Sequence, residues 1–145
     1  MKATVAAPQT SSPTAPTASS AAVTPFSIIE ALAGREIMVT GFTGFLGKVL
    51  VAQLLMDLPA VRRVHVLIRA SRTEDALSRF VRIAARSPAF RPLRERFGED
   101  LGAFLGARIE VHEGDVSEPL FGLSAASVRD LAPRLDAIVH VAGLT

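Results

Sequence analysis

Three evenly spaced glycines, Gly41, Gly44 and Gly47, stand where a short apolar run meets a helical pattern. A turn of this kind brings backbone N–H groups up to a phosphate, because glycine has no side chain to hold a ligand away. We expect Gly41 to permit the tight turn, Gly44 to let the backbone approach a pyrophosphate, and Gly47 to let the helix pack closely. The N-terminus of that helix adds unpaired donors and a positive dipole end. The candidate cofactor contacts in this turn are Gly41, Thr43, Gly44, Phe45, Leu46 and Gly47.

The second apolar run ends in arginine, at the place where NAD-binding domains carry an acid. That acid accepts hydrogen bonds from the ribose 2′-hydroxyl. Here residues 68–72 read Ile-Arg-Ala-Ser-Arg, and the first acid is Glu74. A guanidinium group pairs with a 2′-phosphate, whereas a carboxylate repels it. The sequence therefore favours NADPH, with Arg69 as the first phosphate ligand, Arg72 as the second and Ser71 as a further donor. The alternative is a pair of exposed loop arginines.

Two further loops should face the same cofactor, because ligands of parallel sheets bind outside the carboxyl ends of the strands. After the third apolar run, Asp115 and Val116 would flank the adenine, with the aspartate accepting from its amino group. After the fourth, Ala142 and Gly143 are small enough for the dinucleotide to lie against the backbone. An ordinary turn at Gly114-Asp115 is the competing interpretation.

The elements that must position these residues alternate between strand and helix patterns. Strands are predicted at 35–39, 64–68, 108–113 and 136–141, and helices at 26–32, 45–58, 73–86, 89–97, 99–105 and 124–132. Ser27 and Ser124 are the expected N-caps of the first and last helices. The alternation predicts an α/β fold, a doubly wound parallel sheet in the order 3-2-1-4, which is the first half of a Rossmann fold.

Composition divides the chain into a tail and one domain. Residues 1–24 are mostly Ala, Pro, Ser and Thr, which bury too little apolar surface to fold. We therefore expect a disordered tail at 1–24 and an NADP-binding domain at 25–145, truncated at its C-terminal end. No apolar stretch reaches the roughly 18 residues of a membrane span, and no signal-peptide layout is present. These absences favour a cytoplasmic protein.

Metal chemistry is not predicted. The chain has no cysteine, which excludes thiolate sites and disulfides. Its three histidines, His65, His112 and His140, fall singly in three different predicted strands. A role in the core or at a strand end is favoured for each of them over a role as a metal ligand.

Arginine is concentrated in one part of the chain, with eleven arginines against five acids between residues 62 and 108. Such a stretch can meet an anionic ligand or a membrane surface. Arg79, Arg82 and Arg86 recur at helical spacing opposite the apolar residues Leu77, Phe80, Val81 and Ala84, which favours a solvated helical face. A nucleic-acid partner is not expected, because no series of base-stacking aromatic residues interleaves the basic residues and the chain has no Tyr or Trp. Peripheral membrane contact stays open.

Four motifs together resemble one branch of the extended short-chain dehydrogenases. They are Thr-Gly-Phe-Thr-Gly-Phe-Leu-Gly at 40–47, Val-Leu-Ile-Arg at 66–69, Glu-Gly-Asp-Val-Ser-Glu-Pro at 113–119 and Val-His-Val-Ala at 139–142. This is the fatty acyl-CoA reductase and thioester reductase branch, and the resemblance covers about 34–145. The segment at 86–94 looks most like the fatty acyl-CoA reductases. The resemblance implies NADPH-dependent reduction of an acyl-CoA or acyl-carrier thioester to an aldehyde or an alcohol.

Two departures from that family affect what the chain could do. The family usually has alanine where Gly143 stands, which exchanges one small residue for another. Its catalytic tyrosine and the lysine four residues later lie beyond the fourth strand, whereas this chain has no tyrosine and its lysines are Lys2 and Lys48. We therefore assign no catalytic residue and expect an N-terminal fragment that is inactive by itself. The alternatives are a reductase domain for carrier-bound thioesters and, if the chain is complete, a non-catalytic nucleotide-binding module.

Overall fold

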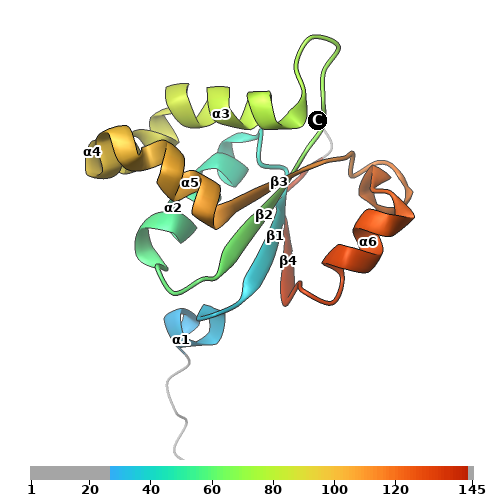
Figure 1. Ribbon diagram of the computed structural model, residues 1–145, viewed down its shortest axis with the longest axis horizontal. Helices are drawn as coiled ribbons and strands as arrows, with labels where there is room; N and C mark the ends of the chain where they lie inside the picture. Colours follow the sequence, from blue (N-terminus) through green and yellow to red (C-terminus); the bar gives the residue numbers. More distant parts are fainter. Residues whose placement is uncertain (1–26, 144–145) are drawn as a thin grey trace, which may run out of the picture.

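The computed structural model describes residues 27–143, which form a four-stranded sheet with helices on both faces (Figure 1). The strands are β1 (Glu36–Thr40), β2 (Arg63–Ile68), β3 (Ile109–Glu113) and β4 (Ala137–His140). They are parallel and lie in the order β3-β2-β1-β4. The predicted α/β class and the order 3-2-1-4 are thus confirmed. The tail predicted at 1–24 lies outside the described residues.

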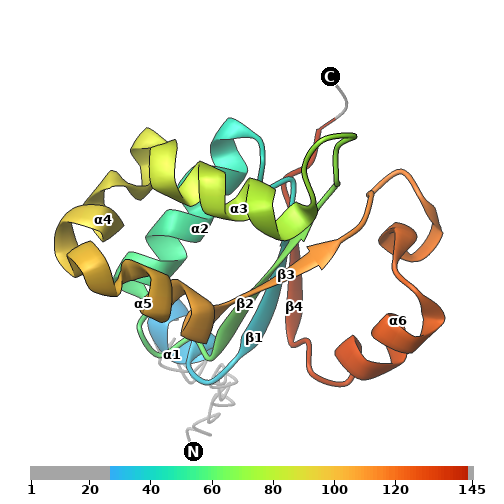
Figure 2. The same ribbon diagram turned by 45° about the horizontal axis from the view of Figure 1, so that its top comes forward.

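The helices are divided unequally between the two faces. They are α1 (Ile28–Leu32), α2 (Phe45–Asp57), α3 (Ala76–Arg86), α4 (Arg91–Phe97), α5 (Leu101–Arg108) and α6 (Ala125–Leu131), with 3₁₀ turns at Pro88–Phe90, Gly98–Asp100 and Pro119–Gly122. Figure 2 shows α2 to α5 on one side of the sheet and α6 on the other. Right-handed crossovers place α6 on the opposite face from α2 to α5, because the chain moves from β1 through β2 to β3 in one direction and then returns to β4 in the other. Among residues 27–143, no helix has the length and apolar character to cross a membrane.

Local capping sets where several helices begin. Ser27 caps α1 and Ser124 caps α6, as predicted. The helix expected from residue 73 begins instead at Ala76, because the Asp75 carboxylate accepts the backbone N–H of Ser78 at 2.9 Å. The sequence-based boundary was three residues early, and the residues before Asp75 are left free to form a loop.

The main core lies between the sheet and helices α2 to α5. Every second residue of β1 and β2 points into it, since strand side chains alternate between faces. These buried residues are Ile37, Val39, Val64, Val66 and Ile68, together with Val51, Leu55, Phe80, Phe90 and Leu93 from the helices and the 3₁₀ turn. This core fixes the position of α2 against β1, and the glycine turn connects the two.

Helix α3 does not bury the whole apolar face that its pattern predicted. Phe80 and Ala84 are buried, but Leu77 and Val81 remain 60% and 57% exposed. They line a shallow groove beside α5 and the edge strand β3. Two of the four apolar residues opposite the arginines therefore stay outside the core, because α3 is at the edge of the layer.

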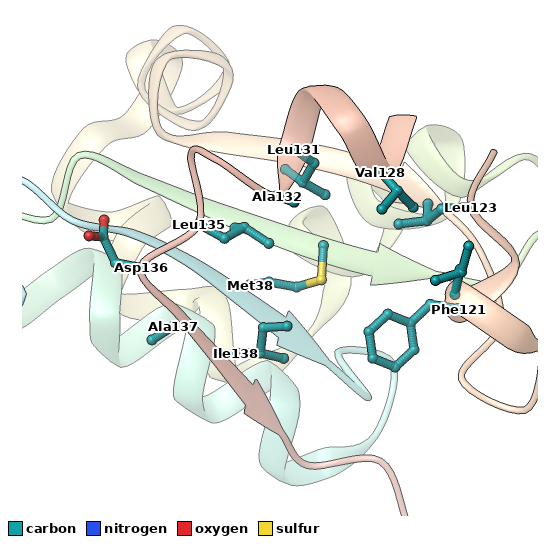
Figure 3. Close-up of a pocket in the computed structure, with 11 residues that line it drawn as sticks. Met38, Phe121, Leu123, Val128, Leu131, Ala132, Leu135, Asp136, Ala137 and Ile138 are labelled. Atoms are coloured by element: carbon teal, nitrogen blue, oxygen red, sulfur yellow. The ribbon is translucent and has the colours of Figure 1, made fainter. Parts of the chain in front are cut away.

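The α6 side of the sheet is packed less completely. A hollow of about 400 Å³ lies between α6, the loop before it and strands β1 and β4 (Figure 3). Met38 of β1 and Ile138 of β4, which are register partners, form its floor. Ile138 is 51% exposed even though it lies on this inner face.

Candidate cofactor-binding site

Parallel pairing carries the four predicted loops to one edge of the sheet (Figure 1). The glycine turn follows β1, Arg69 follows β2, Gly114 and Asp115 follow β3, and Ala142 comes two residues after β4. Backbone bonds extend this edge beyond the strands: the N–H of Gly114 donates to Ile68 at 3.1 Å. Residues from distant parts of the chain thus come to the same edge, where dinucleotides bind in such folds.

The glycine turn is too tightly packed for side chains at two positions. Gly41 has a φ of +77°, and a Cβ there would lie 2.5 Å from the backbone nitrogen of Ala142. A Cβ on Gly47 would lie 2.3 Å from the carbonyl oxygen of Gly41. The first glycine therefore makes the turn and lets β4 approach, and the third lets α2 lie against the turn. Gly44 is exposed and begins α2.

The N-terminus of α2 is open to a ligand. No side chain caps the helix at Gly44, and its first turn carries no acid. Phe45 and Leu46 have side chains that are 81% and 59% exposed, and Thr43 is half-buried. Unpartnered N–H groups at the end of a 13-residue helix favour an anion. The turn therefore fits a pyrophosphate.

Phe42 holds the turn in place, and the sequence analysis missed it. Its side chain is fully buried, and its ring centroid lies 5.2 Å from that of Phe80 and 6.0 Å from that of Phe90. The three rings join the turn to α3 and to the 3₁₀ turn at 88–90. An aromatic residue between the first two glycines was the available signal, but only the tertiary contacts show what it packs against.

Arg69 and Asp115, predicted separately, form an ion pair across the edge. An Nη1–H of Arg69 donates to Oδ2 of Asp115 at 3.2 Å. The N–H and the hydroxyl of Ser117 donate to Oδ1 at 3.0 and 2.7 Å. The Ser117 donors, and then Arg69, hold the pKa of Asp115 below its usual value, so the carboxylate is ionised. The Arg69 side chain is 73% exposed and free to turn toward a ligand.

Two arginines of α3 hold the loop that carries Arg69 and Arg72. Arg79 donates to the carbonyl oxygen of Arg69 at 2.8 Å. Arg82 binds Glu74 with two hydrogen bonds of 2.9 and 2.8 Å. These side chains do more than form the solvated face expected from their spacing, because they fix both ends of the loop. Arg72, between those ends, is exposed.

The loop after β3 folds back on itself beside the cofactor edge. The N–H of Asp115 donates to the carbonyl oxygen of Phe121 at 2.8 Å, and a Cβ on Gly114 would lie 2.3 Å from the same oxygen. Leu120 and Phe121 have φ values of 52° and 58°, an unfavourable region for residues with side chains. Val116, at the start of the loop, is 40% exposed.

The segment after β4 contributes a small surface. Ala142 is half-buried against Gly41, and Gly143 is exposed. A Cβ on Gly143 would meet no atom within 4 Å, so an alanine would fit here without strain. The departure from the family pattern at this residue therefore leaves the shape of the edge intact.

Comparisons of sequence relate the chain to fatty acyl-CoA reductases and to a lipopeptide synthase. A family model for NAD-binding domains, described as "Male sterility protein", matches residues 39–145. The chain is 31% identical over 118 residues to fatty acyl-CoA reductase 2, chloroplastic, of Arabidopsis thaliana. The aligned region covers 81% of the chain and 19% of that protein. It is 38% identical over 110 residues to an isonitrile lipopeptide synthase of Mycobacterium tuberculosis, over 76% of the chain and 4% of that protein.

Comparison with solved structures also finds reductases, here the reductase domains of peptide synthetases. The reductase domain of a non-ribosomal peptide synthetase from Mycobacterium tuberculosis matches with a TM-score of 0.57 and 33% identity, over 77% of the chain and 24% of that domain. The terminal reductase domain of the myxalamid pathway matches with a TM-score of 0.57 and 32% identity, over 78% of the chain and 25% of that domain. The chain thus spans about a quarter or less of the proteins that it resembles.

Proposed function

The chain belongs to the male sterility family of NAD-binding domains, and we propose that it supplies the NADPH-binding part of a reductase of acyl thioesters. The family match supports a nicotinamide cofactor, and the glycine turn at 41–47 fits its pyrophosphate. When bound, the cofactor supplies the hydride. The residues of this chain bind and orient it.

The pyrophosphate is bound by backbone groups. N–H groups at the start of α2 donate to its oxygens, and the contacts come from Thr43, Gly44, Phe45 and Leu46 around the two packed glycines, Gly41 and Gly47. The missing side-chain cap and the exposure of this turn support that role. The exposed side chains of Phe45 and Leu46 would be covered by the ligand, which removes apolar surface from water.

Arg69 carries the proposed preference for NADPH. Its guanidinium lies at the end of β2, where the ribose of a dinucleotide is expected, and its neighbours up to Glu74 include no acid. In the free chain it pairs with Asp115. A 2′-phosphate would draw Arg69 away, while Ser117 keeps Asp115 in place to accept from the adenine. Arg72 adds a second positive charge, Val116 flanks the adenine, and Ala142 and Gly143 leave room for the nicotinamide half.

Fatty acyl-CoA reductases and peptide-synthetase reductase domains both resemble the chain, so the proposed substrate is an acyl thioester on coenzyme A or on a carrier protein. The fatty acyl-CoA reductases are the first choice because the segment at 86–94 resembles theirs. The carrier-bound alternative is favoured by the reductase domains among the solved structures. The chain has no tyrosine to donate a proton, so by itself it should bind the cofactor without turning over substrate.

Calorimetry with NADPH, NADH and 2′,5′-ADP tests the proposal. The wild-type chain should bind NADPH and 2′,5′-ADP more tightly than NADH. Arg69→Asp should weaken NADPH binding by about 10- to 100-fold, the value of one or two charge-assisted hydrogen bonds, and leave NADH nearly unchanged. Arg86→Asp, which makes the same charge change at an exposed position of α3, should leave both affinities unchanged. Equal affinities of the wild type for NADPH and NADH would reject the role of Arg69.

A further inference from the structure

A second group of polar side chains lies on the α6 face of the sheet, apart from the residues assigned to the cofactor. Glu36 comes from β1, His65 from β2, and Glu110 and His112 from β3. His65 and Glu110 are register partners, and His112 is two residues beyond Glu110, so all three side chains share one face. The two histidines are 47 positions apart in the chain, yet Nδ1 of His65 lies 2.9 Å from Nε2 of His112.

The donor atoms of this cluster are spaced for a metal ion. Oε1 of Glu110 lies 3.5 Å from Nε2 of His112, and one ligand atom from each of the three residues falls within 4.8 Å of the others. Zn²⁺ binds histidine nitrogen and carboxylate oxygen at about 2.0–2.2 Å, which places neighbouring ligand atoms roughly 3–3.7 Å apart. The His112 and Glu110 atoms lie within this range, and the two histidine nitrogens, now at hydrogen-bond distance, would move slightly apart to admit the ion. We propose that His65, His112 and Glu110 form a binding site for a divalent transition-metal ion, with Zn²⁺ as the best match.

Glu36 orients the first of these ligands. Nε2 of His65 lies 3.0 Å from Oε2 of Glu36, and both side chains are almost wholly buried. A carboxylate at this distance accepts a hydrogen bond from Nε2–H, so the neutral ring presents the lone pair of Nδ1 to His112 and Glu110. Histidines that bind metals are usually held in this way by a carboxylate behind the ring. The arrangement of His65 therefore suits a metal ligand as well as a buried hydrogen bond.

Glu110 can bind a metal ion without giving up its arginine partners. Its Oε2 accepts from Arg134 at 2.7 Å and from Arg63 at 3.1 Å. Its Oε1 faces His112 and is the atom that would meet the ion. The two guanidinium groups orient the carboxylate, but their positive charge also repels a cation. We therefore expect an affinity in the micromolar range rather than that of a thiolate zinc site.

Solvent reaches two of the three proposed ligands. The side chain of His65 is fully buried, whereas those of His112 and Glu110 are 14% and 28% exposed. An ion could enter past Glu110 and complete a tetrahedral shell with a water molecule, as in sites with three protein ligands. The bound ion would link β2 to β3, so its role would be to stabilise the sheet. Metal binding at this site does not depend on the proposed reductase activity.

Zinc titration of the tag-free, EDTA-treated chain tests the site. Calorimetry should show one ion per chain, and the melting temperature should rise as zinc saturates the site. His112→Gln and Glu110→Gln should each weaken binding at least tenfold. His140→Gln is the matched control, because it removes the remaining histidine of a chain that has three and should leave the affinity unchanged.

A spectroscopic probe covers the case in which a variant does not fold, as judged by circular dichroism. Co²⁺ added to the wild type should give the visible absorption bands of a tetrahedral nitrogen and oxygen site. Added Zn²⁺ should displace the bound Co²⁺ and abolish these bands. Folded wild-type protein that binds no zinc at 100 µM free ion and gives no such Co²⁺ bands would overturn the proposal. So would binding that His140→Gln abolishes and His112→Gln leaves intact. The cluster would then be a hydrogen-bonded network only.

Discussion

The two faces of the sheet are built from the same strands but are held together differently. Toward α2 to α5, β1 and β2 present Ile37, Val39, Val64, Val66 and Ile68, all part of one apolar core. Toward α6, the intervening residues include Glu36, His65 and Met38, of which the first two belong to an ionic cluster. All five residues of β1 are buried, so burial alone does not separate the two faces. Alternation along a strand is what separates them.

The difference matters for how the cofactor edge is supported. The apolar face places α2 and the glycine turn through Phe42 and the helices it contacts. The α6 face joins neighbouring strands by directed contacts, such as that of His65 with Glu36. It also contains a hollow and the half-exposed Ile138. Changes on the first face should therefore act through packing, and changes on the second through charge and hydrogen bonding.

The largest effect is expected on the apolar face, for Phe42→Ala. Removing a fully buried ring from a cluster of three should lower the free energy of unfolding by about 3–5 kcal/mol. Phe45→Ala, three residues away but 81% exposed, should change it by less than about 0.5 kcal/mol. Urea unfolding followed by circular dichroism measures both. Similar losses in the two variants would show that Phe42 does not anchor the turn.

A smaller effect is expected on the polar face. His65→Leu should lower the free energy of unfolding by about 1–3 kcal/mol, because buried Glu36 loses a donor. In a double-mutant cycle with Glu36→Gln, measured in EDTA, the two changes should be coupled by at least about 0.5 kcal/mol. His65→Leu combined with Phe42→Ala, on the opposite face, should be additive. Coupling between the faces that equals the coupling within the cluster would show that the two faces do not act independently.

The smallest effect concerns Asp136, which joins the starts of β1 and β4. Its carboxylate accepts the N–H of Glu36 at 2.9 Å and a bond from Arg35 at 2.6 Å. The backbone N–H first, and Arg35 second, lower the pKa of Asp136 below its ordinary value of 3.8. Since the folded state favours the ionised form, the stabilisation is complete above that value and is lost as the pH falls through the lowered pKa.

Melting curves of wild type and Asp136→Asn measure this loss. The wild type should be the more stable at pH 7, and the two curves should converge between about pH 4 and pH 2. The deficit of Phe42→Ala should not change over that range, because packing involves no proton. An Asp136→Asn deficit that persists at pH 2 would show that shape, and not charge, makes this contact.

Much of the fold was predictable because its signals are local. The period of apolar residues located the strands, Ser27 and Ser124 marked two helix starts, and the three glycines marked the turn. The class and strand order were confirmed, as was the family. Arginine at position 69 was recognised as a candidate phosphate ligand from its place after β2. The assignment of the cofactor residues stays a prediction that the binding experiments test.

Other features depend on contacts between distant residues and had no such signal. Arg79 and Arg82 were read as a solvated face, since their partners lie ten and eight positions earlier in a loop. Leu77 and Val81 fit a buried helical face by period, but α3 reaches the edge of its layer. The histidines fell singly in separate strands, and only parallel pairing brought His65 and His112 together.

The sequence by itself determined the alternation of strands and helices, the backbone conformation of the glycine turn and the charge offered after β2. These follow from short-range sterics and periodicity, which act within a few residues. The tertiary structure decided which side chains meet: the ring cluster around Phe42, the Arg69 and Asp115 pair, and the histidine cluster on the α6 face. Those contacts depend on strand register and layer order, and a one-residue shift in register would change every one of them.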